Sequence, residues 1–213
     1  MSPQIIGEAN EMKIMLIAAC MGHIICGITD CMFAYTKNGR FDFANMKDEG
    51  KMKHVFSAMP LRQIEVGMML GVVALFLASF GYVAVADWMK NYGTVAANIM
   101  KISALFFLIL ISAHHVLCGA VEWFYVKSGM REEALKGVTE FFKKTAFVAI
   151  AYVGLLVYVI ILFVMIVTGK TDLPEWACVF NTLPAFLILA PTKIPAKGNI
   201  ANAFMFLGLT ILL

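Results

Sequence analysis

Residues 145–168 read TAFVAIAYVGLLVYVIILFVMIVT, an apolar stretch without a single charged side chain. A transmembrane helix needs about 20 such residues to cross a hydrocarbon core of about 30 Å, so this stretch predicts a membrane-spanning helix. The chain as a whole has the same character, because 61% of its 213 residues are hydrophobic and 15% are charged, against roughly 45–50% and 25% in soluble domains. The composition excludes a soluble globular fold, a secreted enzyme and a nucleic-acid-binding protein, and makes the lipid bilayer the expected environment.

Similar apolar stretches lie on both sides of this one, and together they predict an all-α fold, a polytopic integral membrane bundle of about six transmembrane helices. Pro184 lies in the fifth stretch and predicts a kink or an early end, and the sixth is barely long enough to cross the core at about 1.5 Å per residue. No soluble segment separates the spans, so we expect residues 1–213 to form a single transmembrane domain. The predicted spans are residues 14–35, 63–86, 102–126, 145–168, 175–192 and 199–213.

The positions of the basic residues predict how the spans are oriented. Most of the 17 Lys and Arg residues lie in or beside the first, third and fifth loops. Because the cytoplasmic loops of membrane proteins are enriched in Lys and Arg, we expect the odd-numbered loops in the cytoplasm and both termini outside. The net charge of +3 therefore reflects orientation and indicates no nucleic-acid partner.

Two octamers in the first and third predicted spans resemble each other. Residues 23–30 read HIICGITD and residues 115–122 read HVLCGAVE, so His, Cys and Gly recur in place and an acidic residue ends each octamer. Both copies would run in the same direction through the bilayer, which predicts a parallel duplication of a two-helix unit, helices 1–2 and 3–4. The alternative is a coincidence between two apolar octamers.

The polar residues of each octamer share one helical face, because positions i, i+3, i+4 and i+7 align along a helix. If the duplicated helices face each other, the two stripes line one intramembrane polar cavity, which opens to the cytoplasm because Asn199 and Asn202 lie in the same half. Structural roles compete with this interpretation, since interfacial carboxylates reach water and buried histidines hydrogen-bond across helices. The candidate catalytic residues are His23, Asp30, His115, Glu122, Arg62 and Glu65.

Two kinds of chemistry fit these residues. A His-x-x-Cys pair on each of two helices supplies two imidazoles and two thiols, the ligand set of many zinc sites, so a divalent metal such as zinc is the candidate cofactor, with a bis-histidine haem as a related idea. Acid–base partners must come from different helices, because seven residues along one helix span about 10.5 Å. The expected pairs are His23 with Glu122 or His115 with Asp30. The candidate metal ligands are His23, His115, Cys26 and Cys118.

The sequence favours an integral-membrane enzyme that acts on a lipid-like or isoprenoid-like substrate, with a metal-dependent mechanism as one option. A small transporter or a membrane component that binds a small-molecule ligand is the alternative, and a structural membrane subunit without a site is a third. The chain contains no G-x-x-x-x-G-K-[ST], G-x-S-x-G, H-E-x-x-H or C-x-x-C motif, so the chemistries of those motifs are unsupported. Gly67 and Gly71 form a G-x-x-x-G that indicates helix packing, and no feature indicates the oligomeric state.

Overall fold

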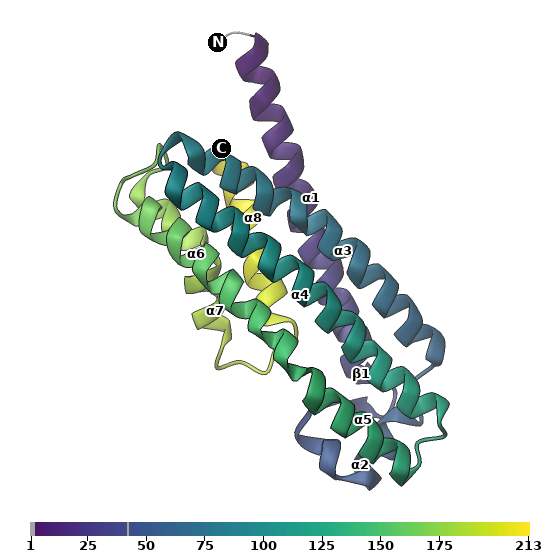
Figure 1. The fold of residues 1–213 in the computed structure, drawn as a ribbon. Helices are drawn as coiled ribbons and strands as arrows, with labels where there is room; N and C mark the ends of the chain where they lie inside the picture. The colour runs from purple at the N-terminus through teal and green to yellow at the C-terminus, as the bar shows by residue number, and fades with distance from the viewer. Residues whose placement is uncertain (1–2, 42) are drawn as a thin grey trace.

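A computed structural model describes residues 3–41 and 43–213 of the chain (Figure 1). The described residues fold almost entirely into helices, with one short hairpin in which Tyr35 pairs with Arg40 and Thr36 with Gly39. The α-helices are α1 Pro3–Ala34, α2 Glu49–Phe56, α3 Leu61–Trp88, α4 Thr94–Lys127, α5 Glu132–Thr145, α6 Ala151–Val167, α7 Thr182–Leu189 and α8 Lys197–Leu212. The shorter elements are β1 Tyr35–Thr36, β2 Gly39–Arg40, and the 3-10 helices η1 Phe43–Lys47, η2 Met89–Asn91, η3 Ala146–Ile150 and η4 Glu175–Phe180.

Four helical segments within the described residues are long and apolar enough to cross a membrane. They overlap the first four predicted spans, so the prediction of an all-α fold is confirmed, and these four segments are candidates to span the membrane. All four begin before their predicted starts, and the fourth does so because α5 continues through η3 into α6 and forms one candidate span with it. These segments are Asn10–Ala34, Leu61–Asn91, Thr94–Lys127 and Glu132–Val167.

The region of the fifth predicted span differs from the expected single helix. Residues 175–192 form η4 and then the eight-residue α7, with Asn181 between them in an extended conformation, φ −64° and ψ 148°. The Asn181 side chain accepts a hydrogen bond of 2.9 Å from the Leu183 N–H and donates one of 3.0 Å to the Val159 carbonyl of α6. Asn181 therefore starts a new helix and ties it to α6, which a pattern of apolar residues does not reveal.

The four long helical segments pack side by side in the order α1, α3, α4 and α6. α3 packs against both α1 and α4, α4 packs against α6, and α8 packs against α1 and α7. A Cβ atom at Gly22 of α1 would lie 2.5 Å from the Ala74 carbonyl oxygen and 2.7 Å from the Ala78 nitrogen of α3. The close approach of α1 and α3 therefore requires glycine at this position.

The buried apolar residues form two large clusters at opposite ends of the bundle. One contains Tyr82, Tyr158 and Phe206, and the Tyr158 hydroxyl donates a hydrogen bond of 2.9 Å to the Tyr82 carbonyl. The other contains Phe56 and Tyr125 and lies where α2 and α5 cover the end of the bundle opposite the N-terminus (Figure 1). Most of the polar residues of the two octamers lie between these clusters, in the middle of the molecule.

Both long charged loops contain helices of their own, α2 in the first and α5 in the third. Asp48 caps α2, because its carboxylate accepts a hydrogen bond of 3.0 Å from the Lys51 backbone N–H. This hydrogen bond holds the pKa of the Asp48 carboxyl below its ordinary value. The loops are therefore ordered caps on one end of the bundle.

Candidate metal and ligand site

His115 of α4 is buried against α3, where two glycines make room for its ring. Its Nε2 atom lies 3.1 Å from the Gly67 carbonyl oxygen, and a Cβ atom at Gly71 would collide with the imidazole. A carbonyl only accepts hydrogen bonds, so Nε2 carries the proton and, in the neutral ring, Nδ1 carries the lone pair. The G-x-x-x-G that indicated helix packing thus also seats and orients this histidine.

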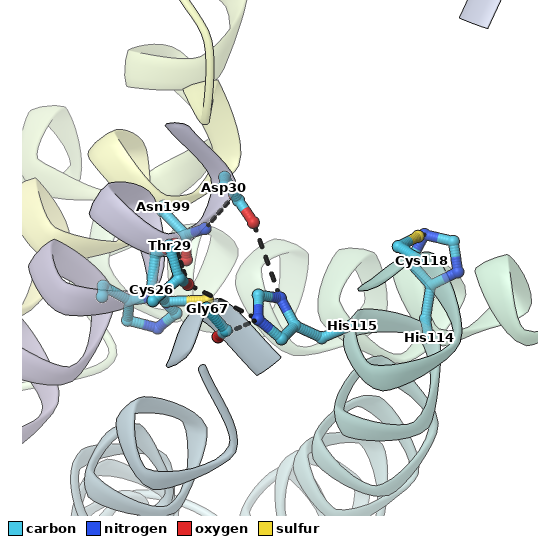
Figure 2. Close-up of polar contacts among 9 residues, drawn as sticks. Cys26, Thr29, Asp30, Gly67, His114, His115, Cys118 and Asn199 are labelled. Carbon is cyan, nitrogen blue, oxygen red and sulfur yellow. Dashed lines mark hydrogen bonds and ion pairs between the residues drawn. The ribbon is translucent and has the colours of Figure 1, made fainter. Parts of the chain in front are cut away.

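Asp30 of α1 faces the Nδ1 side of this ring. One carboxylate oxygen, Oδ1, lies 3.6 Å from His115 Nδ1, and the other, Oδ2, accepts a hydrogen bond of 2.8 Å from the Asn199 amide (Figure 2). A lone pair directed at a carboxylate is unfavourable, so this arrangement favours a cation between the two atoms, either a proton on Nδ1 or a metal ion. Of the two interhelical pairs expected from the sequence, the structure brings together His115 with Asp30.

Cys26 completes a group of three potential ligands. It lies one turn before Asp30 on α1 and therefore on the same face of the helix. One ligand atom from each of Cys26, Asp30 and His115 lies within 4.8 Å of the other two. Sulfur, carboxylate oxygen and imidazole nitrogen are all ligands that zinc accepts in proteins. This Cys–Asp–His group is the only one of its kind among the residues that the structure describes.

His23 lies apart from this group, but it is connected to it through Asn199. Its Nδ1 atom lies 2.9 Å from the Asn199 carbonyl oxygen, and its Nε2 atom lies 3.2 Å from the Tyr82 hydroxyl. The amide oxygen only accepts, so Nδ1 donates and Nε2 accepts from the tyrosine. Hydrogen bonds therefore run from Tyr82 through His23 and Asn199 to Asp30, and both ring nitrogens of His23 are engaged.

The other predicted site residues are distributed more widely. Cys118 is 3.6 Å from His114 Nε2, on a part of α4 away from the Cys–Asp–His group (Figure 2). Glu65 is exposed and accepts a hydrogen bond of 2.9 Å from the Trp123 indole. Arg62 is exposed, and no ion pair between it and Glu65 is present in the described part of the chain. These contacts leave Glu65 and Arg62 outside the buried group.

Glu122 is buried in the wall of the site, with 5% of its surface exposed. Its Oε2 atom has no hydrogen-bond partner among the described residues. The structure does not pair it with His23, whose ring nitrogens are taken by Asn199 and Tyr82. The two acidic residues that end the octamers therefore have different surroundings, because both oxygens of Asp30 have polar neighbours and Glu122 Oε2 has no hydrogen-bond partner among the described residues.

A cavity of about 490 Å³ adjoins the Cys–Asp–His group, which is a size typical of small-molecule sites. It lies beside the connection of α7 to α8, and two basic side chains brace that connection. Arg40 donates a hydrogen bond of 2.8 Å to the Lys193 carbonyl, and Lys197 donates one of 2.7 Å to the Ala190 carbonyl. Polar lining residues include Cys26, Asp30, His115, Cys118, Glu122 and Asn199, and apolar lining residues include Phe33, Leu75, Phe107, Ile111 and Leu155.

Three contributors to the site were given other roles or no role by the sequence. Gly67 and Gly71 carried a signal, the spacing of four, but that spacing indicates close packing without naming the side chain that is packed. Tyr82 carried no signal, because a tyrosine within an apolar span resembles any other core aromatic residue. The contact of each with a histidine depends on the relative rotation of two helices, which the chain alone does not specify.

A model of one protein family matches residues 1–211, almost the whole chain, and its description is a family of unknown function, DUF6796. No curated protein and no solved structure matches the chain.

Proposed function

The chain belongs to this family of unknown function, and we propose from its geometry that it is an integral-membrane, zinc-dependent enzyme that acts on a lipid-like substrate. The observation that carries this proposal is the Cys–Asp–His group, whose three ligand atoms lie within 4.8 Å of one another beside a cavity of about 490 Å³. Three protein ligands with one open position facing a cavity are typical of catalytic zinc sites.

The hydrogen bonds around the group support metal binding. Histidine ligands almost always donate their other N–H to a carbonyl or carboxylate, and ligating carboxylates are themselves hydrogen-bonded. His115 Nε2 lies 3.1 Å from the Gly67 carbonyl oxygen. Asp30 accepts a hydrogen bond of 2.8 Å from the Asn199 amide. A thiolate and a carboxylate also neutralise a divalent cation, which reduces the cost of a charged site inside a membrane.

Different residues of this chain would bind the metal ion, bind the substrate and orient a metal ligand. Cys26, Asp30 and His115 would hold the ion, which when bound supplies an activated water for hydrolysis of an ester or amide bond. The apolar wall near Phe107 would bind the chain of the substrate and exclude bulk water from the reacting bond. Asn199 would keep Asp30 in the orientation that ligation needs.

The finer architecture belongs to the same proposal. We place α7 and α8 in the membrane as short helices that complete a bundle of six, and we derive helices 1–2 and 3–4 from one duplicated unit. Support for the duplication comes from the recurrence of His, Cys and Gly in place in the octamers at 23–30 and 115–122. The basic residues near the cavity mouth support an opening toward the cytoplasm.

A second function, proton-coupled transport, is favoured by one specific observation. The hydrogen bonds from Tyr82 through His23 and Asn199 to Asp30 connect the buried core to the cavity, as a proton route would. A transporter moves a solute across the membrane, whereas the proposed enzyme does not. Uptake of a solute into proteoliposomes, driven by a pH gradient and lost in His23→Phe, would favour transport.

The enzyme proposal is tested with protein reconstituted in liposomes made from a total lipid extract. Mass spectrometry after incubation should show a new lipid product with the zinc-loaded wild type and none with His115→Ala, while Cys118→Ser, which alters the other octamer cysteine, should retain the product. Unchanged lipids with zinc-loaded wild type, or equal product from His115→Ala, would refute the proposal.

A further inference from the structure

Two basic side chains of the cavity lining take no part in the metal site. Arg40 of β2 and Lys197 at the start of α8 both line the cavity of about 490 Å³. Arg40 is exposed and Lys197 is partly exposed, so a ligand can reach both residues. Neither forms an ion pair with an acidic side chain in the part of the chain that the structure describes.

Both side chains have hydrogen-bond donors to spare. Arg40 donates one hydrogen bond to the Lys193 carbonyl oxygen, and Lys197 donates one to the Ala190 carbonyl oxygen. A guanidinium carries five N–H donors and an ammonium three, so most of these donors have no protein partner among the described residues. The two bonds to the α7–α8 connection hold the bases in place and leave the other donors for a ligand.

The bases give the metal-loaded cavity a net positive charge. A Cys26 thiolate and an Asp30 carboxylate offset the two positive charges of a zinc ion. Glu122 is the remaining acidic residue among the described residues of the lining. Two basic side chains against this one acid leave the lining positive whether or not Glu122 is ionised. A cavity lined by one sign of charge attracts ligands of the opposite sign, so the lining favours an anion.

The two bases lie at the end of the cavity that adjoins the Cys–Asp–His group. Lys197 is two residues before Asn199, whose amide donates a hydrogen bond to Asp30. Arg40 belongs to the hairpin that directly follows α1, and its hydrogen bond to Lys193 joins that hairpin to the α7–α8 connection. An anion held by both bases would therefore sit beside the metal site, at the cavity mouth.

The opposite end of the cavity is apolar. Phe107 and Leu155 line it there and belong to the central core cluster. Phe107 is eight residues before His115 on α4, which is about 12 Å at 1.5 Å per residue. A ligand that extends from the mouth to this wall needs a charged head and an apolar chain.

We infer that the cavity binds a single-chain amphiphile whose anionic phosphate head is held by Arg40 and Lys197. The inference rests on the proposed function, because it names the substrate class of the same cavity. Phosphate oxygens accept hydrogen bonds from the fork of a guanidinium and from the rotatable donors of an ammonium. A volume of about 490 Å³ suits one ligand of drug-like size, which favours one chain over two. With the head at the mouth, the bond between head and chain lies beside the Cys–Asp–His group.

Two alternatives make different predictions. If the bases only hold the α7–α8 connection, their removal should weaken every ligand alike, whatever its head group. If the phosphate binds the metal ion itself, its advantage over other head groups should persist without the bases. The preference for one head group over another therefore tests the inference better than affinity alone.

The experiment compares three radiolabelled probes with one sixteen-carbon chain: hexadecyl phosphate, hexadecanol and hexadecylamine. Equilibrium binding is measured with zinc-loaded protein in dodecyl maltoside micelles, and empty micelles correct for partition. Hexadecyl phosphate should bind about tenfold more tightly than the other two probes, the effect of about one charge-assisted hydrogen bond. Inorganic phosphate should displace it only at a concentration at least about 100-fold higher, because the free ion buries no chain. Displacement at equal concentrations would identify a site for free phosphate and overturn the amphiphile.

Variants assign the preference to the two bases. Arg40→Gln and Lys197→Gln should each reduce the preference for phosphate, and the double variant should abolish it. Lys197→Arg keeps the charge and should keep the preference. Arg131→Gln is the matched control, since Arg131 is also exposed and donates to a backbone carbonyl, that of Ser128. It should keep the wild-type pattern, and the melting temperature of each variant shows that it is folded.

The possible failures point to different conclusions. Equal affinity of the wild type for phosphate and alcohol, tightest binding of the amine, or a phosphate preference that persists in the folded double variant would overturn this inference alone. Absence of a lipid product in the liposome experiment would overturn the enzyme and leave the head-group preference standing. Failure of all three probes to bind saturably would overturn the lipid-like ligand of both proposals.

Discussion

The amide of Asn199 donates a hydrogen bond of 2.8 Å to the carboxylate of Asp30, which lies 169 positions earlier in the chain. This contact joins the start of α8 to α1 and fixes the carboxylate oxygen that does not face His115. The same amide accepts a hydrogen bond from His23 at 2.9 Å, so one side chain links both histidines to one acid. Asn199 is therefore the positioning residue of the Cys–Asp–His group.

Replacing Asn199 by Ala should weaken zinc binding by about 10-fold to 100-fold, the usual effect of removing a partner that orients a metal ligand. The dissociation constant is measured by competition with a chelating dye. Asn38→Ala, at an exposed asparagine of the first loop, is the control and should leave the zinc affinity unchanged. Equal zinc affinity in Asn199→Ala and wild type would show that Asp30 needs no support.

Gly71→Ala should displace the His115 ring, because the added Cβ atom would occupy the position of the imidazole. Overpacking of this kind costs about 1–3 kcal/mol in the free energy of unfolding, and the zinc content should fall with it. Gly137→Ala is a matched control on α5, where an added Cβ atom meets nothing within 4 Å. That substitution should be neutral or stabilising by about 0.5–1 kcal/mol, as measured by the thermal unfolding of both variants.

The two octamer histidines should respond differently to substitution. His115→Ala should abolish zinc binding, because it removes a ligand. His23→Phe keeps an aromatic ring against Phe206, where the two rings stack at 5.7 Å, but leaves the Tyr82 hydroxyl and the Asn199 oxygen unpaired. It should destabilise the fold by about 1–3 kcal/mol while retaining bound zinc, which elemental analysis and thermal unfolding will show. Equivalent zinc loss in both variants would instead make His23 a ligand.

Zinc affinity should fall as the pH falls, since binding requires a Cys26 thiolate and releases its proton. Each proton released contributes about a tenfold change in affinity per pH unit. Cys26→Ser should bind zinc more weakly and with a shallower pH dependence, whereas Cys118→Ser should keep the wild-type slope. Identical slopes in both variants would exclude Cys26 as a ligand.

The local composition of the chain predicts the positions of most of the long helices. The stretch at 145–168 predicts its own helix because an apolar run of this length has few other stable environments. The break at Asn181 is not predictable in the same way, since it depends on a hydrogen bond to the Val159 carbonyl of another helix. Likewise, α5 is charged enough to resemble a loop, and it becomes a helix with an apolar face on the second core cluster.

The candidate site was only partly predictable for a related reason. Helical spacing places Cys26 and Asp30 on one face, and it requires His115 to find a partner on another helix. The octamers HIICGITD and HVLCGAVE are nearly equivalent as sequences, yet Asp30 has two polar neighbours and Glu122 Oε2 has none. The difference arises because α8 docks against α1 and supplies Asn199 beside Asp30. This contact joins residues far apart in the chain, so local sequence does not predict it.

Binding of a divalent metal ion by Cys26, Asp30 and His115 is the property on which the proposed function depends. The most direct test is elemental analysis of the detergent-purified protein, purified without chelators, for the wild type, Cys26→Ser and Cys118→Ser. We expect about one zinc per chain in the wild type and in Cys118→Ser, and a loss of most of that zinc in Cys26→Ser. Absence of metal from the wild type, or equal zinc in the two cysteine variants, would contradict this expectation.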